Sequence, residues 1–367
     1  MKIALVIYGD INQRSGGYAY DRKLVDYFIS RGASVEILSL PQSSYGPSLF
    51  LNGNKHVQNL LLSWDGDLMI QDELVHPSLF LLNSKLKKKG IKIVGLVHHL
   101  RQREDHPGIF KTLIYTPVER LYLKSLQGFV FNSRTSQKDV ETLLSCSCPG
   151  PIATPGFELP QNLLSRESVP GISPTSSPDF IKSPRTLGIL KILFVGSLIP
   201  RKNLLVLLKA LADWMYPHWS LTVVGEGPDN AYNRRCRKLA KKLGDKVSFL
   251  GYLAPAELHE VYGTHHILTL PSDYEGFGMV YLEAMAQRCI PLGGKWGGAA
   301  EVIGDAGVLV APGDKGEILA ALDFLTTYPD WEKQQEKARL RALSFDTWDR
   351  SFSKVWDYLQ VTLHAGF

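Results

Sequence analysis

The sequence contains only four cysteines in 367 residues, Cys146, Cys148, Cys236 and Cys289. They are too few for a disulfide framework, and the Cys146-x-Cys148 pair has no second pair to complete a zinc site. We therefore expect a reduced, cytoplasmic protein. No apolar run reaches the roughly eighteen residues that span a bilayer, which excludes a transmembrane helix. No small-residue cleavage site follows MKIALVIYGD, so this N-terminal segment indicates a buried first strand and not a signal peptide.

Charged residues are not abundant either, at 21% of the chain against 44% hydrophobic residues. This balance is typical of a globular protein and excludes a disordered chain, a coiled coil and a collagen-like fibre. At roughly 150 residues per domain, the length indicates two domains plus connections.

The net charge of +5 is unevenly distributed. Residues 1–187 hold 21 Lys and Arg against 16 Asp and Glu, whereas residues 188–367 hold 20 of each. Within residues 85–124, ten basic residues stand against three acidic ones. The ten are Lys85, Lys87, Lys88, Lys89, Lys92, Arg101, Arg103, Lys111, Arg120 and Lys124. Such a segment either meets an anionic membrane or an acidic substrate, or is an ordinary solvated surface.

Short apolar, β-branched runs alternate with helical patterns along the chain. They are IALVIYG, VEILSL, LMIQ, IKIVGLVHH and GFVFNS in the first half, and KILFVGS, SLTVVGEG, KVSFLGY, HILTLPS, CIPLGG and GVLVAPG in the second. This alternation predicts an α/β fold with parallel sheets covered on both faces. We predict two doubly wound Rossmann-like domains, residues 1–165 and 188–349, with a ligand cleft at the carboxyl ends of the strands.

The segment between these domains, residues 166–187, is rich in Ser and Pro and is expected to be a linker that carries an insertion, which begins near residue 160. A last helix over residues 350–367 is expected to cross back onto the first domain.

The most informative segment is HILTLPSDYEGFGMVYLEAMAQR, residues 266–288. We expect a strand, a loop with Gly276 and Gly278, and then a helix. Two glycines at such a turn let a ligand approach the backbone, and the free N–H groups of the first helical turn form a phosphate site. Glu275 in the loop and Glu283 in the helix would contact the ligand on either side of the phosphates. The spacing of the two glutamates alone is not specific, so the glycine context provides the specificity.

Other turns add candidate contacts. FVGSLIPRKNLLVLLKAL (194–211) places Arg201 and Lys202 after a strand, where cations can neutralise a leaving diphosphate, although a basic pair at a helix start is also common in solvent. SGGYAY (15–20) opens the first helix, and GLVHHL (95–100) ends a strand with two histidines. Adjacent side chains of a strand point in opposite directions, so one histidine is expected to face the cleft. VVGEGPDN and FLGYL are ordinary glycine turns when taken alone.

Together these motifs resemble those of the retaining, nucleotide-sugar-dependent glycosyltransferases of family 4, the glycogen synthase and sucrose synthase-like group with the GT-B fold. The resemblance covers nearly the whole chain and is most specific in the E-x7-E motif, from Glu275 to Ala286. It extends to the Gly293–Gly298 segment with Glu301, and to GSLIPRKN, VGEGP and SGG. Two differences from the usual pattern are Ser197, where many relatives have an arginine, and His98-His99, where His-Asp is more usual.

The resemblance implies four catalytic residues: Glu275, His98, Arg201 and Lys202. Glu275 would stabilise positive charge at the anomeric carbon, His98 would contact the donor sugar, and the two cations would neutralise the diphosphate. Glu283 would hold the ribose hydroxyls. The full set of implied substrate contacts is Gly16, Gly17, Gly225, Glu226, Tyr252, Leu253, Gly276, Phe277, Gly278, Met279 and Glu283. No metal or cofactor is implied, and no Asp-x-Asp loop accompanies these motifs.

The implied activity is that of a metal-independent hexosyltransferase that moves a sugar from a nucleoside-diphosphate sugar to an acceptor hydroxyl with retention, and no nucleic acid partner is expected. The basic segment suggests a lipid-linked or cell-envelope glycan acceptor, or an exopolysaccharide. Apolar positions such as Leu113, Ile114, Val118 and Leu121 would then lie on the inner face of a membrane, unless that helix packs on the sheet.

Several other functions remain open on the sequence alone. A nucleotide-sugar epimerase, a sugar phosphorylase or a non-catalytic sugar-nucleotide-binding subunit would use the same cleft. A dinucleotide-dependent oxidoreductase is disfavoured, because no G-x-G-x-x-G follows an early strand.

Overall fold

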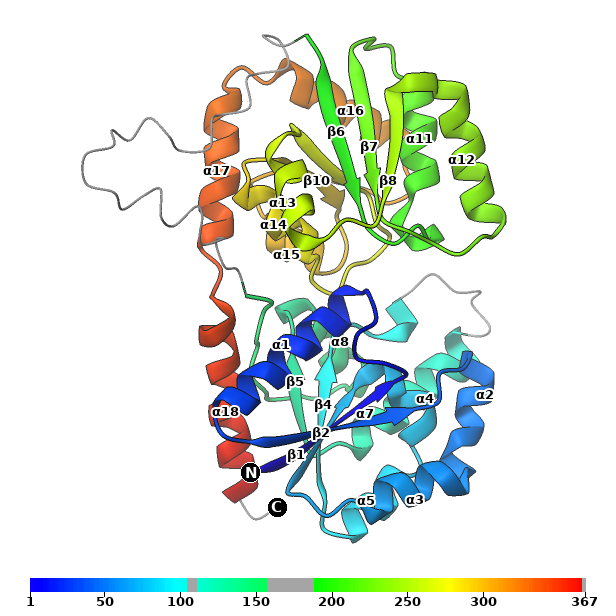
Figure 1. The fold of residues 1–367 in the computed structure, drawn as a ribbon, viewed down its shortest axis with the longest axis vertical. Coiled ribbons are helices and arrows are strands. Elements are labelled where there is room, and N and C mark those ends of the chain that lie inside the picture. Colours follow the sequence, from blue (N-terminus) through cyan, green and yellow to red (C-terminus); the bar gives the residue numbers. More distant parts are fainter. Residues whose placement is uncertain (104–110, 157–187, 365–367) are drawn as a thin grey trace, which may run out of the picture. The chain divides into compact units, whose positions relative to one another are not determined.

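The computed structural model describes residues 1–103, 111–156 and 188–364, and the chain divides into two compact units (Figure 1). Unit 1 comprises residues 1–156 and 346–367, and unit 2 comprises residues 157–345. The predicted linker, 166–187, and the insertion expected from residue 160 lie outside the described residues. The last helix, α18 (Trp348–His364), belongs to unit 1 and packs against its first helix.

Unit 1 is built on a five-stranded parallel sheet with the order β2-β1-β3-β4-β5. The strands are β1 (Lys2–Tyr8), β2 (Ser34–Leu40), β3 (Leu68–Asp72), β4 (Lys92–Val97) and β5 (Gly128–Phe131). The α-helices are α1 (Gly16–Ser30), α2 (Tyr45–Phe50), α3 (Lys55–Ser63), α4 (His76–Leu79), α5 (Asn83–Lys88), α7 (Thr116–Ser125), α8 (Arg134–Leu144) and α18. Short turns of 3-10 or π helix are η1 (Leu51–Gly53), η2 (Glu73–Val75), η3 (Arg101–Arg103) and η4 (Lys111–Tyr115).

The central strand β1 shows why these apolar runs form a covered sheet. Ala4 and Val6 pack in a hydrophobic cluster on one face, and Ile3 and Ile7 pack in a second cluster on the other face. Successive side chains of a strand point to opposite faces, so a continuous apolar run requires helices on both sides. Helices α1 and α18 contribute apolar side chains to the second cluster.

Unit 2 is built on a six-stranded parallel sheet with the order β11-β10-β9-β6-β7-β8. The strands are β6 (Leu190–Val195), β7 (Trp219–Val224), β8 (Val247–Gly251), β9 (Ile267–Leu270), β10 (Ile290–Gly294) and β11 (Val308–Val310). The helices are η6 (Pro200–Lys202), α11 (Leu204–Asp213), α12 (Ala231–Leu243), η7 (Gly244–Lys246), α13 (Pro255–Gly263), α14 (Met279–Ala286), α15 (Gly298–Ile303), α16 (Lys315–Thr327) and α17 (Trp331–Leu343).

Both sheets are doubly wound, which confirms the predicted fold class and the predicted strands. The strand order reverses between β1 and β3 in unit 1 and between β6 and β9 in unit 2. Loops that leave such a switch point diverge, and ligands of open α/β sheets bind there. Within the described ranges, no helix is long and apolar enough to cross a membrane.

Candidate functional site

In unit 2, the loops after β6 and β9 bring Arg201, Lys202 and Glu275 together at the switch point. Lys202 ends η6, and its Nζ donates a hydrogen bond to Oε1 of Glu275. Nη1 of Arg201 lies 3.9 Å from Oε2 of Glu275 and donates to the backbone carbonyl of Tyr274. Glu275 is only 7% exposed. Three of the four predicted catalytic residues therefore meet at one edge of one sheet.

The ionisation of these three groups is interdependent. Burial by itself raises the pKa of Glu275, but the charges of Lys202 and Arg201 outweigh it and hold that pKa below its usual value. Burial lowers the pKa of Lys202, and the carboxylate of Glu275 partly offsets this effect. Two cations thus face one carboxylate that is ionised at neutral pH, and the cluster keeps an excess of positive charge that suits an anionic ligand.

The loop that carries Glu275 packs backbone to backbone against the start of α15. The N–H of Gly298 donates to the carbonyl of Glu275 at 2.6 Å. A Cβ at Gly298 would lie 2.3 Å from the carbonyl oxygen of Gly276, closer than real Cβ atoms approach. Gly278, the N-cap of α14, has a φ of 95°, which favours glycine. The loop therefore reaches the first turn of α14, whose amides have no partner within the helix.

The predicted contacts Phe277 and Met279 lie on either side of Gly278. Phe277 is buried with its ring 5.8 Å from that of Phe345, so a ligand would meet its backbone and not its side chain. Met279 is half-buried and begins α14.

The second glutamate of the E-x7-E motif, Glu283, lies in α14. Its carboxylate accepts a hydrogen bond from the Tyr262 hydroxyl of α13 at 2.8 Å. Burial raises the pKa of Glu283, and the hydrogen bond from Tyr262 opposes that shift. Glu275 and Glu283 are therefore held differently, one by cations and the other by a neutral hydroxyl.

The remaining predicted contacts of unit 2 follow β7 and β8, at the same edge of the sheet. A Cβ at Gly225 would lie 2.1 Å from the carbonyl oxygen of Gly196, so this glycine lets two strand ends approach each other. The backbone carbonyl of Glu226 accepts a hydrogen bond at 2.8 Å from the loop after β6. Tyr252 is 46% exposed, and Leu253 is half-buried. The structure brings Gly225 and Glu226 beside the loop of Arg201 and Lys202.

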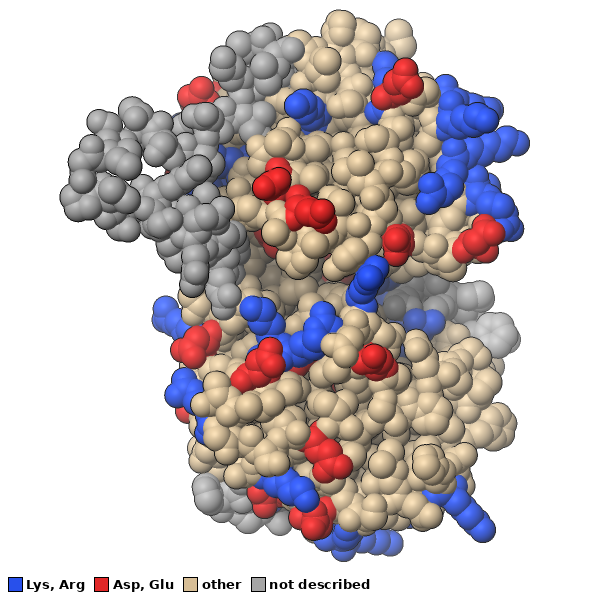
Figure 2. Space-filling view, in the orientation of Figure 1, with Lys and Arg blue, Asp and Glu red and all other residues tan. Residues whose placement is uncertain are grey.

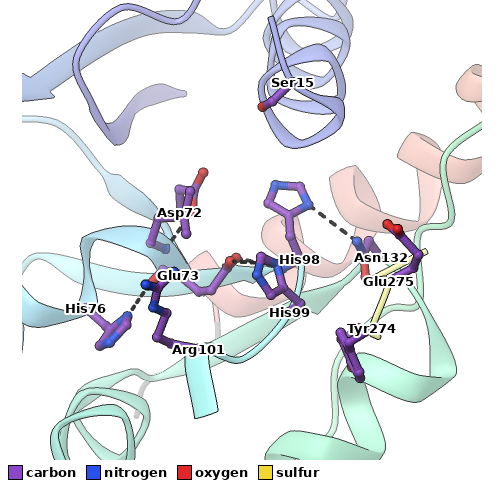
Figure 3. A network of polar contacts seen from close by, with 12 residues as sticks. Ser15, Asp72, Glu73, His76, His98, His99, Arg101, Asn132, Tyr274 and Glu275 are labelled. Carbon is purple, nitrogen blue, oxygen red and sulfur yellow. Dashed lines mark hydrogen bonds and ion pairs between the residues drawn. The ribbon is translucent and has the colours of Figure 1, made fainter. Parts of the chain in front are cut away.

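In unit 1, the fourth predicted catalytic residue, His98, follows β4 and is only 7% exposed (Figure 3). Its Nε2 lies 3.0 Å from Oδ1 of Asp21, which belongs to α1. Its backbone N–H donates to Oε2 of Glu73 at 2.7 Å, just after β3. Its Nδ1 faces the carboxamide nitrogen of Asn132 at 3.5 Å, just after β5. Side chains from three other elements thus enclose this histidine.

The predicted glycines of unit 1 lie at the start of α1, capped by Ser15, whose hydroxyl accepts from the N–H of Tyr18 at 3.3 Å. A Cβ at Gly17 would lie 3.6 Å from Cδ2 of His98, so the imidazole lies against this backbone. Gly16 is the first residue of the helix. The structure therefore joins Gly16, Gly17 and His98 in one cluster.

Charge in this cluster is strongly shifted. Burial lowers the pKa of His98, but the carboxyl groups of Asp21, Glu73 and Asp72 raise it to about 10. Burial raises the pKa of Asp72 to about 7, with help from the charge of Asp21, and burial and Asp72 raise that of Glu73. At neutral pH both ring nitrogens of His98 are therefore protonated.

One atom each of Asp21, Asp72 and His98 lies within 4.8 Å of the other two. This spacing would admit a small cation, but the hydrogen bond between Asp21 and His98 already joins two of the three groups.

Sequence reasoning missed Asp21, Asp72, Glu73 and Tyr262. Two signals were available for three of them. Asp72 and Glu73 directly follow the apolar run LMIQ, at the carboxyl end of a predicted strand. Asp21 stands three and seven residues before Leu24 and Phe28, on the buried face of its helix. No pattern in the sequence points to Tyr262.

Part of the chain is similar in sequence to known proteins. Residues 179–341 match the family described as glycosyl transferases group 1. Over 134 residues the chain is 33% identical to a protein of Corynebacterium glutamicum named GDP-mannose-dependent monoacylated alpha-(1-6)-phosphatidylinositol monomannoside mannosyltransferase. The match spans 34% of this chain and 34% of that relative, about a third of its length.

Solved structures resemble the whole chain. Sucrose-phosphate synthase from Thermosynechococcus elongatus has a TM-score of 0.78 at 18% identity, over 99% of this chain and 100% of that one. HepE of Anabaena in complex with UDP has a TM-score of 0.69 at 18% identity, over 98% and 100%. At this identity the likeness shows the fold, which is the predicted GT-B fold of two Rossmann-like domains. Residues 179–341, which carry the Arg201–Lys202–Glu275 cluster, are similar to the group 1 glycosyltransferases.

Proposed function

We propose that the chain is a retaining glycosyltransferase of family 4, which transfers a sugar from a nucleoside-diphosphate sugar to an acceptor hydroxyl. The observation that carries this proposal is the convergence of Arg201, Lys202 and Glu275 beside the start of α14. As the bond to the sugar breaks, negative charge grows on the diphosphate and positive charge on the anomeric carbon. Preorganised cations stabilise the first, and an ionised carboxylate stabilises the second. The cations perform this work without a metal cofactor.

The protonation states of His98 and Glu275 support retention of configuration. An inverting transfer requires a side chain that accepts the proton of the acceptor hydroxyl. Asp21 and its neighbours keep His98 protonated at neutral pH, so its ring is not such a base. The Glu275 carboxylate is paired with Lys202, and its pKa lies below the usual value. A diphosphate oxygen then accepts the proton, which places the acceptor on the face that the nucleotide leaves.

The donor is a nucleoside-diphosphate sugar in this proposal. The HepE structure contains UDP, and the name of the Corynebacterium relative specifies GDP-mannose. The two ligands differ in the base and share the nucleoside diphosphate. The backbone from Gly276 to Met279 binds the diphosphate and sugar, and Glu283 accepts hydrogen bonds from the ribose hydroxyls. Further contacts within unit 2 come from Gly225, Glu226, Tyr252 and Leu253.

We further propose a lipid-linked acceptor at an anionic membrane surface, on the inner face of which the protein is peripheral. Helix α7 packs on unit 1 through buried Tyr122 and Leu123, so the expectation that it covers the sheet holds for one of its faces. Its outer face exposes Leu121, 52% accessible, between the exposed cations Arg120 and Lys124, and the preceding turn exposes Leu113 at 67%. Exposed leucines among cations suit an anionic interface. The Corynebacterium relative is named for a phosphatidylinositol mannoside.

Unit 2 carries a different cationic surface. On the face drawn in Figure 2, Lys and Arg side chains gather over α12. This helix has six exposed basic residues and no acidic one: Arg234, Arg235, Arg237, Lys238, Lys241 and Lys242. It exposes no large apolar side chain, so it offers charge alone, whereas the α7 surface offers charge and apolar area together.

The test of the transferase proposal begins with thermal shift against a panel of nucleoside diphosphates and their sugars. A ligand at ten times its dissociation constant stabilises the fold by about 1.4 kcal/mol. The stabilising donor is then incubated with candidate lipid and glycan acceptors, and proton NMR of the product reports the anomeric configuration. We expect transfer with retention and only slow hydrolysis of donor alone. An inverted product, or conversion of donor alone to another sugar nucleotide, would refute the proposal.

A further inference from the structure

His98 is held by carboxylates of two different elements, one at its ring and one at its backbone. Asp21 of α1 meets its Nε2 at 3.0 Å, and Glu73 accepts from its backbone N–H at 2.7 Å. We propose that Asp21 is a positioning residue, which keeps His98 doubly protonated and fixes the orientation in which its ring meets the donor sugar. The link to the sugar rests on the proposed transferase function, but the state of the ring does not.

The burial and contacts of Asp21 support this positioning role. Asp21 is fully buried, and its Oδ1 is occupied by His98. Its other oxygen, Oδ2, is buried and has no hydrogen-bond partner within the described part of the chain. Asp72 is next to it, since one oxygen of each lies within 4.8 Å of the other and of the ring. Two adjacent buried carboxylates do not both ionise readily, so a proton on Asp72 relieves their repulsion and can supply the missing donor.

The charges of Asp72, Asp21 and His98 can then balance one another. A proton on Asp72 leaves the Asp21 carboxylate opposite the imidazolium charge. The groups that face the ring are Asp21 and the edge of Tyr20 from α1, Asp72 and Glu73 from the end of β3, and Asn132 from the end of β5. None of these is a cation, so all the ionisable carboxyl groups favour a protonated ring. The Asn132 carboxamide can present either its N–H₂ or its oxygen to Nδ1, so it accommodates this state.

A purely structural role for Asp21 leads to a different expectation. In that case its replacement lowers stability but leaves the ionisation of His98 and the pH dependence of turnover unchanged. The positioning role requires both the ionisation of His98 and the pH dependence of turnover to change. The neutral amide of Asn has no charge to hold the second proton on the ring.

The decisive measurement is imidazole ¹H–¹⁵N NMR of ¹⁵N-histidine-labelled protein between pH 5 and pH 9, with the His98 signal assigned by its loss in His98→Gln. In the wild type we expect both ring nitrogens to remain protonated at pH 8. In Asp21→Asn we expect the pKa of the ring to fall below about 7, so that the ring is neutral at pH 8. The matched control is Asp139→Asn, which removes a buried carboxylate of unit 1 that pairs with Arg103. It should leave the His98 signal unchanged.

Turnover gives the second readout. Asp21→Asn should lower kcat by about tenfold to a hundredfold, because misplacing a functional group by about 1 Å can cost about 100-fold. The KM for the donor should change less than about threefold, since the group acts on orientation and not on uniform binding. Asp139→Asn should retain wild-type kcat.

Several results would overturn the assignment. A neutral His98 ring in the wild type between pH 7 and pH 8 would do so even if Asp21→Asn failed to fold. An unchanged ring state in a folded Asp21→Asn protein would do so as well, as would a chelatable cation bound at Asp21. If the wild type transferred no sugar, the transferase proposal would fail, while the NMR titration would still decide the state of His98.

Discussion

Lys202 donates a hydrogen bond to Glu275 although the two residues lie 73 positions apart in the chain. The contact arises because β6 and β9 are neighbours in one parallel sheet, with Ile192 opposite Ile267. Parallel neighbours end at the same edge, so their following loops meet there. A pairing of strands that are distant in sequence thus creates the charged cluster on which the proposed chemistry depends.

Replacing Glu275 by Gln should remove the negative charge of this cluster while keeping a side chain of similar size. Lys202 and Arg201 would then face a neutral amide, and the anomeric carbon would lose its carboxylate. We expect the rate of transfer to fall by at least about 100-fold. Breaking a buried pair by removing one partner typically costs about 3–5 kcal/mol of unfolding free energy. Steady-state kinetics and urea unfolding measure the two effects.

The matched control for this variant is Asp213→Asn. Asp213 pairs with Lys315 in the same unit, and their side chains are 59% and 45% exposed. This variant should lose no more than about 1 kcal/mol of unfolding free energy, because solvent screens an exposed pair. A Glu275→Gln protein with near wild-type transfer would contradict the proposed mechanism.

The same pair predicts a pH dependence of stability. The pKa of Glu275 in the folded protein lies below the ordinary value of 4.5. Its stabilising contribution is therefore fully present above that ordinary value and is lost as the pH falls through the lower, folded-state value. The wild type should lose more unfolding free energy than Glu275→Gln between pH 5 and pH 3, as measured by urea unfolding. Parallel curves for the two proteins would show that Glu275 is not held by its cations.

Replacing Gly298 by Ala should disturb the Glu275–Gly278 loop through packing alone. The new Cβ would lie 2.3 Å from the carbonyl oxygen of Gly276, a rigid backbone atom. We expect a loss of about 1–3 kcal/mol in unfolding free energy, as for other overpacked sites, and a smaller thermal shift on addition of nucleoside diphosphate. Gly263→Ala is the control, because its nearest neighbour would be a side-chain oxygen at 3.7 Å. Equal behaviour of the two variants would argue against close packing of the Glu275–Gly278 loop on α15.

Replacing Tyr262 by Phe should make nucleotide binding more sensitive to acid. The Tyr262 hydroxyl donates to Glu283 at 2.8 Å and opposes the rise in the pKa of that carboxyl caused by burial. Without the hydroxyl this pKa rises further, so the carboxylate proposed to bind the ribose hydroxyls becomes protonated at a higher pH. We expect the dissociation constant for nucleoside diphosphate, measured by calorimetry, to increase more between pH 8 and pH 6 in Tyr262→Phe than in the wild type. An identical pH dependence would remove Glu283 from the binding site.

Replacing Leu113 and Leu121 together by Gln should weaken membrane binding without reducing the positive charge. Both side chains are more than half exposed, so the fold should tolerate the change. Flotation with vesicles that contain an anionic phospholipid should recover wild-type protein and markedly less of the double variant. Leu340→Gln, at an exposed leucine of unit 2, is the control. If charge reversal of Lys241 and Lys242 on α12 abolished flotation while the leucine variant still floated, the contact would be assigned to the wrong surface.

Local sequence determined the strands and the residue types of the Glu275–Gly278 loop. Continuous apolar runs such as IALVIYG predict buried parallel strands because both faces of such a strand must be covered, and the structure confirms this for β1. The glycine pair in the loop after β9 predicted a turn into a helix, and α14 begins at Met279. These features depend on neighbours in sequence, so they can be read without the fold.

Only the tertiary structure decided which distant side chains share an environment. Nothing near His98 in the sequence indicates that Asp21 and Glu73 enclose it, since they come from a helix and a strand end that approach β4 only in the folded sheet. The same holds for Tyr262 and Glu283. Burial and pairing set the charge of an ionisable group, and both are properties of the folded chain. The sequence by itself therefore named the reactive residue types, while the fold decided their protonation and their partners.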